Sequence, residues 1–195
     1  MVIQTFMGST PNLTLCTFNC RGHRQDKIDY VKKIMTSCDV LFLQEHWLFT
    51  ENVPFFVEKI GNVNVHATSG MDETQLLIGR PYGGCAILWK KSLNCVFSPI
   101  DTGNKRIVAG ALSFHNVKIL LCNIYMPCDG SYHDPLSQSF DDVLSVVRSL
   151  IEMNSADFVL LGGDMNTDLN RPHSERVKSL VELCNKQGLF YMEIF

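Results

Sequence analysis

The stretch FVLLGGDMN, residues 158–166, decides the fold that we expect for this chain. Its large apolar residues predict a buried strand at 158–161, two glycines end that strand, and Asp164 and Asn166 follow. A strand that ends in polar groups is a common way for a rigid sheet to present chemistry at its edge. Taken alone, the stretch allows two interpretations: a catalytic carboxylate with a supporting amide, or an ordinary Gly-Asp turn, because these residues also favour turns.

The composition is that of an ordinary globular domain. The 195 residues suffice for one domain with a sizeable core. Hydrophobic residues make up 46%, charged residues 19%, and the net charge is −3, which argues against a disordered chain and against a dedicated non-specific nucleic-acid binder. The balance leaves room for an enzyme that contacts a few phosphates and uses a divalent cation.

The eight cysteines indicate a reducing environment. No CxxC pair occurs, so zinc-site spacing is absent, and most of the cysteines lie inside apolar runs where a free thiol packs as a small hydrophobe. The sequence has neither a signal-peptide pattern nor an apolar run of membrane-spanning length. We therefore expect an intracellular protein, nuclear or cytoplasmic, with no membrane association.

The hydrophobic periodicity predicts an α/β domain. Residues 1–12 are polar and expected to be irregular, and residues 13–195 form the domain. We predict strands at 13–19, 40–43, 63–67, 83–89, 93–97, 107–114, 118–125 and 158–161, and helices at 24–37, 55–60, 136–154 and 174–187. This order favours two sheets packed face to face with helices outside.

Several predicted strands end in a polar side chain. These side chains are Asn19, Glu45, Tyr125, Asp164 and Asn166. Each alone is explained as a turn residue, a solvated carboxylate or an amphipathic cap on the core. Gathered at one rim, they would suit metal-assisted phosphodiester hydrolysis, with oxygen ligands for a hard cation, a base for water and donors for developing charge.

Four motifs resemble those of the endonuclease/exonuclease/phosphatase superfamily, which includes abasic-site endonucleases and DNase-I-like nucleases. They are Phe18–Gly22, Leu43–Glu45, Asn123–Pro127 and Gly163–Asn166. Residues 44–48 together with 79–89 look most like the endonuclease domain of non-LTR (LINE-type) retrotransposons. The resemblance runs from about Leu13 to the end of the chain, and it implies a four-layer α/β/β/α sandwich.

The resemblance also implies roles for the strand-end residues. Glu45 would be the principal ligand of Mg²⁺, or of Mn²⁺ in its place, with Asn19 close to the metal and the scissile phosphate. Tyr125 would contact that phosphate, Asp164 would orient or deprotonate the attacking water, and Asn166 would support the phosphate. The substrate would be DNA, nicked to leave a 3′-hydroxyl that primes a reverse transcriptase domain in a longer product.

The chain departs from the family pattern in two places. Arg21 stands where the abasic-site branch has a second acidic residue, which fits the DNase-I-like pattern better and suggests a phosphate contact. The family closes with a Ser-Asp-His segment, whereas this sequence ends at Phe195 before any such motif. We therefore expect the domain to be incomplete at its C-terminus, to lack the last strands of the family fold, and to be nearly inactive.

Two other functions remain compatible with these residues. One is a phosphatase or phosphodiesterase of the same superfamily that acts on an inositol phosphate, a lipid headgroup or RNA. The other is a catalytically dead fragment. If DNA is the substrate, we expect contacts from Arg21, Arg24 and Arg106.

Overall fold

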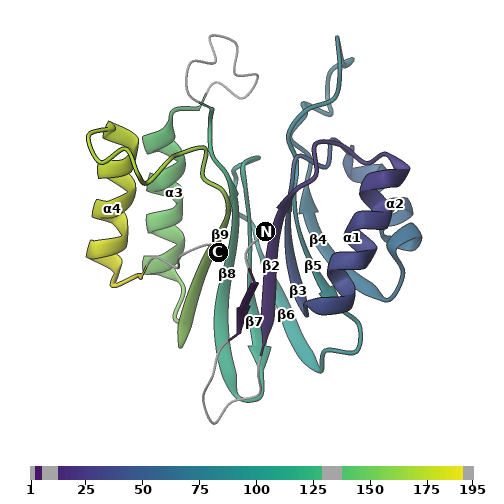
Figure 1. Cartoon of the computed structure of the whole chain (residues 1–195), viewed down its shortest axis with the longest axis horizontal. Coiled ribbons are helices and arrows are strands. Elements are labelled where there is room, and N and C mark those ends of the chain that lie inside the picture. The colour runs from purple at the N-terminus through teal and green to yellow at the C-terminus, as the bar shows by residue number, and fades with distance from the viewer. Residues whose placement is uncertain (1–2, 6–12, 129–137, 191–195) are drawn as a thin grey trace.

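The computed structural model describes residues 3–5, 13–128 and 138–190, which form two sheets packed back to back (Figure 1). The first sheet has the order β1 (Ile3–Thr5), β2 (Thr14–Asn19), β3 (Val40–Gln44), β5 (Cys85–Lys90) and β4 (Val63–Thr68). The second sheet has the order β6 (Cys95–Ile100), β7 (Ile107–Phe114), β8 (Val117–Tyr125) and β9 (Phe158–Asp164).

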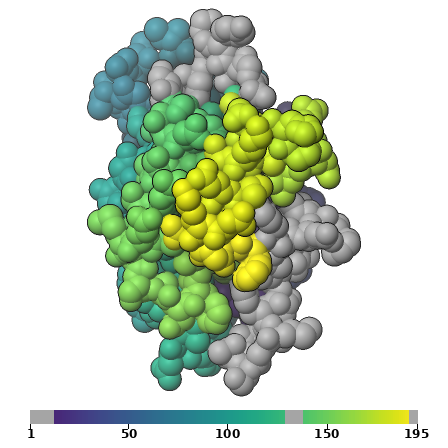
Figure 2. All heavy atoms as spheres, turned by 90° about the vertical axis from the view of Figure 1, so that its left-hand side faces the viewer, coloured from purple at the N-terminus to yellow at the C-terminus, as the bar shows by residue number. Residues whose placement is uncertain are grey.

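Helices cover the outer face of each sheet. In Figure 1, α1 (Gln25–Ser37) and α2 (Val53–Ile60), which follows the 3₁₀ turn Thr50–Asn52, lie on the first sheet. The helices α3 (Phe140–Met153) and α4 (Glu175–Gln187) lie side by side on the second, and the space-filling view shows α4 on the surface of that side (Figure 2). This four-layer arrangement confirms the predicted α/β/β/α sandwich.

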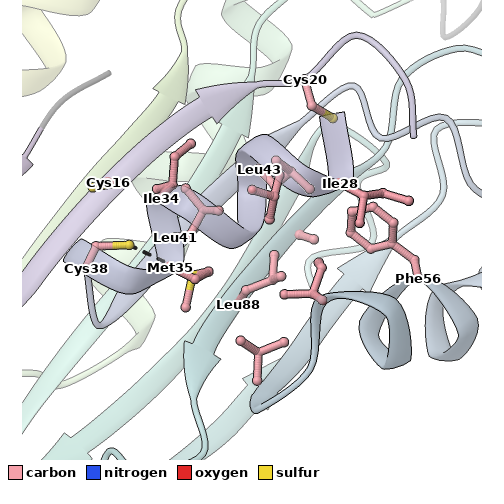
Figure 3. Packing of buried hydrophobic residues seen from close by; sticks show 14 of the residues in the cluster. Cys16, Cys20, Ile28, Ile34, Met35, Cys38, Leu41, Leu43, Phe56 and Leu88 are labelled. Atoms are coloured by element: carbon pink, nitrogen blue, oxygen red, sulfur yellow. Dashed lines mark hydrogen bonds between the residues drawn. The ribbon is translucent and has the colours of Figure 1, made fainter. Parts of the chain in front are cut away.

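Side-chain alternation divides the core into three apolar layers. In β3, Leu41 and Leu43 pack among the residues of α1 and α2, where buried cysteines such as Cys16 and Cys38 fill gaps (Figure 3). Phe42, with the opposite parity, packs between the sheets. A third layer lies under α3 and α4. A strand such as β3, whose two faces are both covered, has a continuous apolar sequence, and this pattern predicted the strand from the sequence.

All eight cysteines are free thiols, as the sequence led us to expect. Cys128 is exposed, Cys95 is half-buried, and the others are buried.

Two β-α-β units deliver the polar strand ends to one rim. The strands β2 and β3 are parallel, with Asn19 opposite Gln44, and β8 and β9 are parallel, with Tyr125 opposite Asp164. Because adjacent parallel strands end at the same edge of a sheet, each unit places two neighbouring strand ends at this rim.

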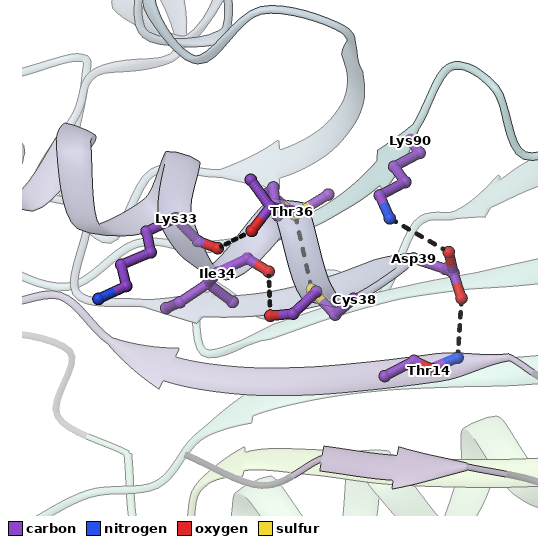
Figure 4. Close-up of polar contacts among 9 residues, drawn as sticks. Thr14, Lys33, Ile34, Thr36, Cys38, Asp39 and Lys90 are labelled. Carbon is purple, nitrogen blue, oxygen red and sulfur yellow. Dashed lines mark hydrogen bonds and ion pairs between the residues drawn. The ribbon is translucent and has the colours of Figure 1, made fainter.

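An aspartate ties each unit together at its opposite end. The Asp39 N–H donates to the carbonyl of Thr14 over 2.8 Å, and Asp39 Oδ2 accepts the Thr14 N–H over 3.0 Å (Figure 4). The Asp157 N–H likewise donates to the carbonyl of Lys118 over 2.8 Å, and Asp157 Oδ2 accepts the Lys118 N–H over 2.8 Å.

The structure corrects the predicted segments in a few places. Residues 3–5 form β1, antiparallel to β2, within the segment expected to be irregular, because three residues are too few for a pattern and their pairing comes from the edge of β2. The third helix begins at Phe140 rather than at 136, because Ser139 and Asp142 form a capping box that starts the helix there. Positions 136 and 137 lie outside the described residues. No helix in the described ranges is both long and apolar enough to cross a membrane.

Candidate active site

The side-chain amide of Asn19 joins two carboxylates at the rim between the sheets. Asn19 Nδ2 donates to Glu45 Oε1 over 2.6 Å and to Asp164 Oδ2 over 2.8 Å. Asn19 ends β2 and Glu45 follows β3 in the first sheet, whereas Asp164 ends β9 in the second. The structure therefore brings together three predicted site residues from both halves of the molecule.

The backbone turns sharply where it presents the two carboxylates. Glu45 has a φ of 56°, a left-handed conformation that interrupts the strand alternation after Gln44. Gly163 has a φ of 134° within β9, and a Cβ there would lie 1.9 Å from the carbonyl oxygen of Ile124. Unusual backbone conformations of this kind persist where surrounding structure enforces them, and they cluster at functional sites.

His46 anchors the loop that follows Glu45. Its side chain is buried, Nε2 donates to the carbonyl of Thr68 over 3.1 Å, and Nδ1 accepts the Leu48 N–H over 3.0 Å. Burial lowers the pKa of His46 to about 4, against hydrogen bonds with the backbone of Cys85 and Thr68 that raise it. The imidazole is therefore neutral and structural.

Tyr125 stands beside Glu45 as a protonated phenol. Burial, followed by the charges of Glu45 and Cys128 and by hydrogen bonds with these side chains, raises the pKa of Tyr125 well above its ordinary value. The hydroxyl therefore stays protonated at neutral pH and serves as a hydrogen-bond donor.

Arg106 lies beneath Tyr125 and not on the molecular surface. It is 3% exposed, Nη1 donates to the Tyr125 carbonyl over 3.3 Å, and the guanidinium carbon lies 5.5 Å from the centre of the Tyr125 ring. The start of β7 packs this side chain under the end of β8, so Arg106 is buried in this structure, and its predicted contact with DNA stays a prediction.

Asn166 ties the turn after β9 to the end of β8. Its N–H donates to Asp164 Oδ1 over 3.1 Å, and its Nδ2 donates to the carbonyl of Met126 over 2.6 Å. With a φ of 45°, Asn166 occupies the left-handed region that asparagine tolerates. It therefore lies at the predicted site, where its observed contacts fix the position of Asp164.

The other two arginines are exposed near the rim. The backbone N–H of Arg21 donates to Asn19 Oδ1 over 3.2 Å, and Arg21 is exposed. Arg24 precedes the first turn of α1 and lies 3.2 Å from Asp26. Their contact with DNA stays a prediction.

The donor set fits a hard divalent cation that keeps much of its water. Glu45 and Asp164 supply carboxylate oxygens, whereas the Asn19 amide oxygen already accepts from Arg21. Among the described residues, no group of three or more His, Cys, Asp or Glu side chains could hold a metal. Mg²⁺ is commonly held by one or two carboxylates together with waters and substrate oxygens, so Glu45 suits that role. A direct ligand role for Asn19 stays a prediction.

Gln44 and Asn123 lie directly beneath the rim, and neither was assigned a role from the sequence, although both fall inside the motifs Leu43–Glu45 and Asn123–Pro127. Gln44 is 1% exposed and Asn123 is 0% exposed. Gln44 Nε2 donates to Asn123 Oδ1 over 2.6 Å, across the space between the sheets. The signal was available, since each is a polar residue on a strand face whose preceding alternate positions, such as Phe42 and Leu121, are apolar.

A sequence profile described as "Endonuclease/Exonuclease/phosphatase family" matches residues 16–186. No curated protein matches the chain.

Solved structures share the fold at low sequence identity. The endonuclease domain of TRAS1, a telomere-specific non-LTR retrotransposon, superposes with a TM-score of 0.64 and 12% identity, covering 88% of this chain and 70% of that one. The 3′ phosphatase NExo from Neisseria, bound to product DNA hairpin, superposes with a TM-score of 0.61 and 16% identity, covering 89% of this chain and 70% of that one. The AP endonuclease LMAP from Leishmania major superposes with a TM-score of 0.63 and 16% identity, covering 88% of this chain and 65% of that one.

Proposed function

The chain belongs to the endonuclease/exonuclease/phosphatase family, and on that basis we propose that it is a Mg²⁺-dependent phosphodiesterase that nicks DNA. The observation that carries this proposal is the Asn19 amide, which holds Glu45 and Asp164 together from opposite sheets. The carboxylates of Glu45 and Asp164, held by the same Asn19 amide, form an oxygen-rich, negatively charged site. Such a site suits a hard cation, which in turn polarises a phosphodiester.

In this proposal each residue has a distinct task. Glu45 holds the cation, with Asn19 orienting its carboxylate; when bound, the cation supplies positive charge that polarises a phosphoryl oxygen. Asp164 accepts a proton from the attacking water, and Asn166 fixes its position through the turn after β9. The Tyr125 hydroxyl, kept protonated by its raised pKa, donates to a phosphoryl oxygen as charge develops there.

The finer assignment is to an endonuclease of the non-LTR retrotransposon type. Supporting it are residues 44–48 and 79–89 and the shared fold of the TRAS1 domain. In this assignment the chain acts inside the cell as part of a longer product, and its nick supplies the 3′-hydroxyl that primes an associated reverse transcriptase domain.

Nicking of supercoiled plasmid tests the reaction. We expect slow, Mg²⁺-dependent formation of nicked circles. Glu45→Gln should lower the rate by about 10²- to 10⁴-fold, while Glu58→Gln, the same change on the exposed face of α2, should leave it intact. Equal rates for the wild type and Glu45→Gln would contradict the proposal, and extension of the nick by a DNA polymerase would establish a 3′-hydroxyl.

A phosphatase or phosphodiesterase with another substrate is the main competing function. The shared fold of the 3′ phosphatase NExo and the net charge of −3 favour it. A panel of inositol phosphates, lipid headgroups, RNA and 3′-phosphorylated DNA, measured beside the plasmid, separates the two functions by their relative rates. A dead fragment would hydrolyse none of them and would show no Mn²⁺ binding by calorimetry.

A further inference from the structure

Gln44 and Asn123 form a buried polar contact between the two sheets, immediately below the candidate active site. Gln44 ends β3 in the first sheet, and Asn123 lies near the end of β8 in the second. Their side chains meet over 2.6 Å, and both are shielded from water. We propose that Gln44 and Asn123 are positioning residues, whose contact fixes the relative placement of Glu45, Tyr125 and Asp164; this inference rests on the proposed function.

Asn123 connects one strand of the second sheet to two strands of the first. Its Nδ2 donates to the carbonyl of Leu43 in β3 over 2.9 Å and to the carbonyl of Ala86 in β5 over 2.8 Å. Its Oδ1 accepts from Gln44. One asparagine side chain thus directs its donors to the backbone of the facing sheet and its acceptor to the Gln44 side chain.

The contact extends to the strand that carries Asn19. Gln44 Nε2 also lies 3.1 Å from Thr17 Oγ1, and Thr17 is two residues before Asn19 on β2. Two of the strands that end at the site, β2 and β8, therefore meet the same Gln44 side chain, which itself precedes Glu45.

The layer below this contact is apolar and lacks such directionality. Phe42 and Leu121 occupy the preceding alternate positions of β3 and β8, and both are fully buried between the sheets. Apolar packing is proportional to buried area and depends weakly on small lateral shifts. Hydrogen bonds with fixed partners lose energy when the sheets slide, so the Gln44–Asn123 contact determines their register at the rim.

A kinetic comparison tests this role. Gln44→Met keeps the length of the side chain and removes its hydrogen bonds with Asn123 and Thr17, and Asn123→Ala removes the three contacts of Asn123. Each should lower kcat for plasmid nicking by about 10- to 100-fold with little change in KM, because outer contacts orient catalytic groups more than they bind substrate. The losses should not multiply in the double variant, since both changes remove the shared Gln44–Asn123 contact.

Leu121→Ala is the matched control. Leu121 lies on the same face of β8, two residues further from the rim, and is fully buried. This variant should lose thermal stability without the fall in kcat, measured at a temperature where every variant is folded. A fall in kcat as large as that of Asn123→Ala would show that loosened packing alone explains the effect, and would overturn the proposal.

The side-chain amide signal of Asn19 in the metal-free protein gives a readout independent of activity. This NMR signal, identified by its loss in Asn19→Asp, should shift in Gln44→Met and Asn123→Ala and stay unchanged in Leu121→Ala. An unchanged signal in the first two variants would overturn the inference, as would a shifted signal with unchanged kcat. If the wild type hydrolyses nothing, the proposed function fails separately, and the Asn19 signal alone decides whether the contact positions the site.

Discussion

The two β-α-β units of the molecule begin alike and end differently. In the unit β2-α1-β3, all five residues of β3 are buried. In the unit β8-α3-β9, Phe158 is exposed and the other residues of β9 are half-buried. Both second strands are tied to their neighbours by an aspartate, and both lead to a carboxylate of the candidate site.

Position in the sheet explains the difference. The strand β3 lies between β2 and β5, whereas β9 is at the edge of the second sheet within the described residues. Apolar sequence alone made both strands look equally buried. The difference implies that Glu45 stands on the more rigid support, and that Asp164 depends more on local contacts such as Gly163, Asn166 and the Asn19 bridge.

Gly163→Ala should have the largest effect on stability. A Cβ would collide with the Ile124 carbonyl, and a φ of 134° is unfavourable for alanine, so we expect a loss of about 4 kcal/mol or more in the free energy of unfolding. Gly61→Ala is the control, because Gly61 has a φ of 75° with no atom within 4 Å of its Cβ, and should cost about 1 kcal/mol. Urea denaturation measures both; similar losses would mean that β9 adapts to the added methyl.

Leu43→Ala and Leu161→Ala test the comparison directly. Leu43 in β3 is 0% exposed, so its truncation should cost about 3 to 5 kcal/mol, whereas truncation of the half-buried Leu161 in β9 should cost about 1 to 2 kcal/mol. Both values come from urea unfolding curves. Equal losses would show that the two strands are supported equally, against the difference in burial.

Acid should destabilise the end of the first unit more than the end of the second. The buried His46 follows Glu45 and can take up a proton, whereas Met165, which follows Asp164, cannot. Burial lowers the pKa of His46 to about 4, below its unfolded value of about 6.5, so the unfolded chain binds more protons between these values. The stability contribution is complete above about pH 6.5 and falls by on the order of 3 kcal/mol as the pH drops to 4.

The measurement is the free energy of unfolding at pH 7 and at pH 4.5. His46→Asn should show a smaller pH dependence than the wild type, and His173→Asn, which changes an exposed histidine, should match the wild type. An unaltered pH dependence in His46→Asn would mean that His46 is not the group whose protonation weakens the fold.

Substitution of Asp39 or Asp157 should give the smallest losses in the free energy of unfolding. Asp39→Ala removes an acceptor from a partly buried site that also includes Lys90 at 3.5 Å, and should cost about 1 to 2 kcal/mol. Asp157→Ala acts at an exposed position and should cost less than about 1 kcal/mol. Thermal unfolding would report both, and a larger loss at Asp157 would reverse the expected order.

The elements and the rim were predictable because each depends on local pattern. Continuous apolar runs, and alternation in segments such as 13–19, marked the strands, and the abrupt change from apolar to polar residues marked Asn19, Glu45 and Asp164. The strand Ile3–Thr5 was not predictable, since it depends on pairing with β2. The burial of Arg106 likewise depends on Tyr125, which is distant in sequence and adjacent across the β7–β8 hairpin.

The central claim is that Glu45 and Asp164, presented by opposite sheets, act as one unit. The most direct test is the rate of plasmid nicking under enzyme excess for Glu45→Gln, Asp164→Asn and the double variant. Groups that act together fail together, so we predict that the double variant is about as slow as the slower single variant. Losses that multiply in the double variant, or a rate unaffected by Asp164→Asn, would contradict the claim.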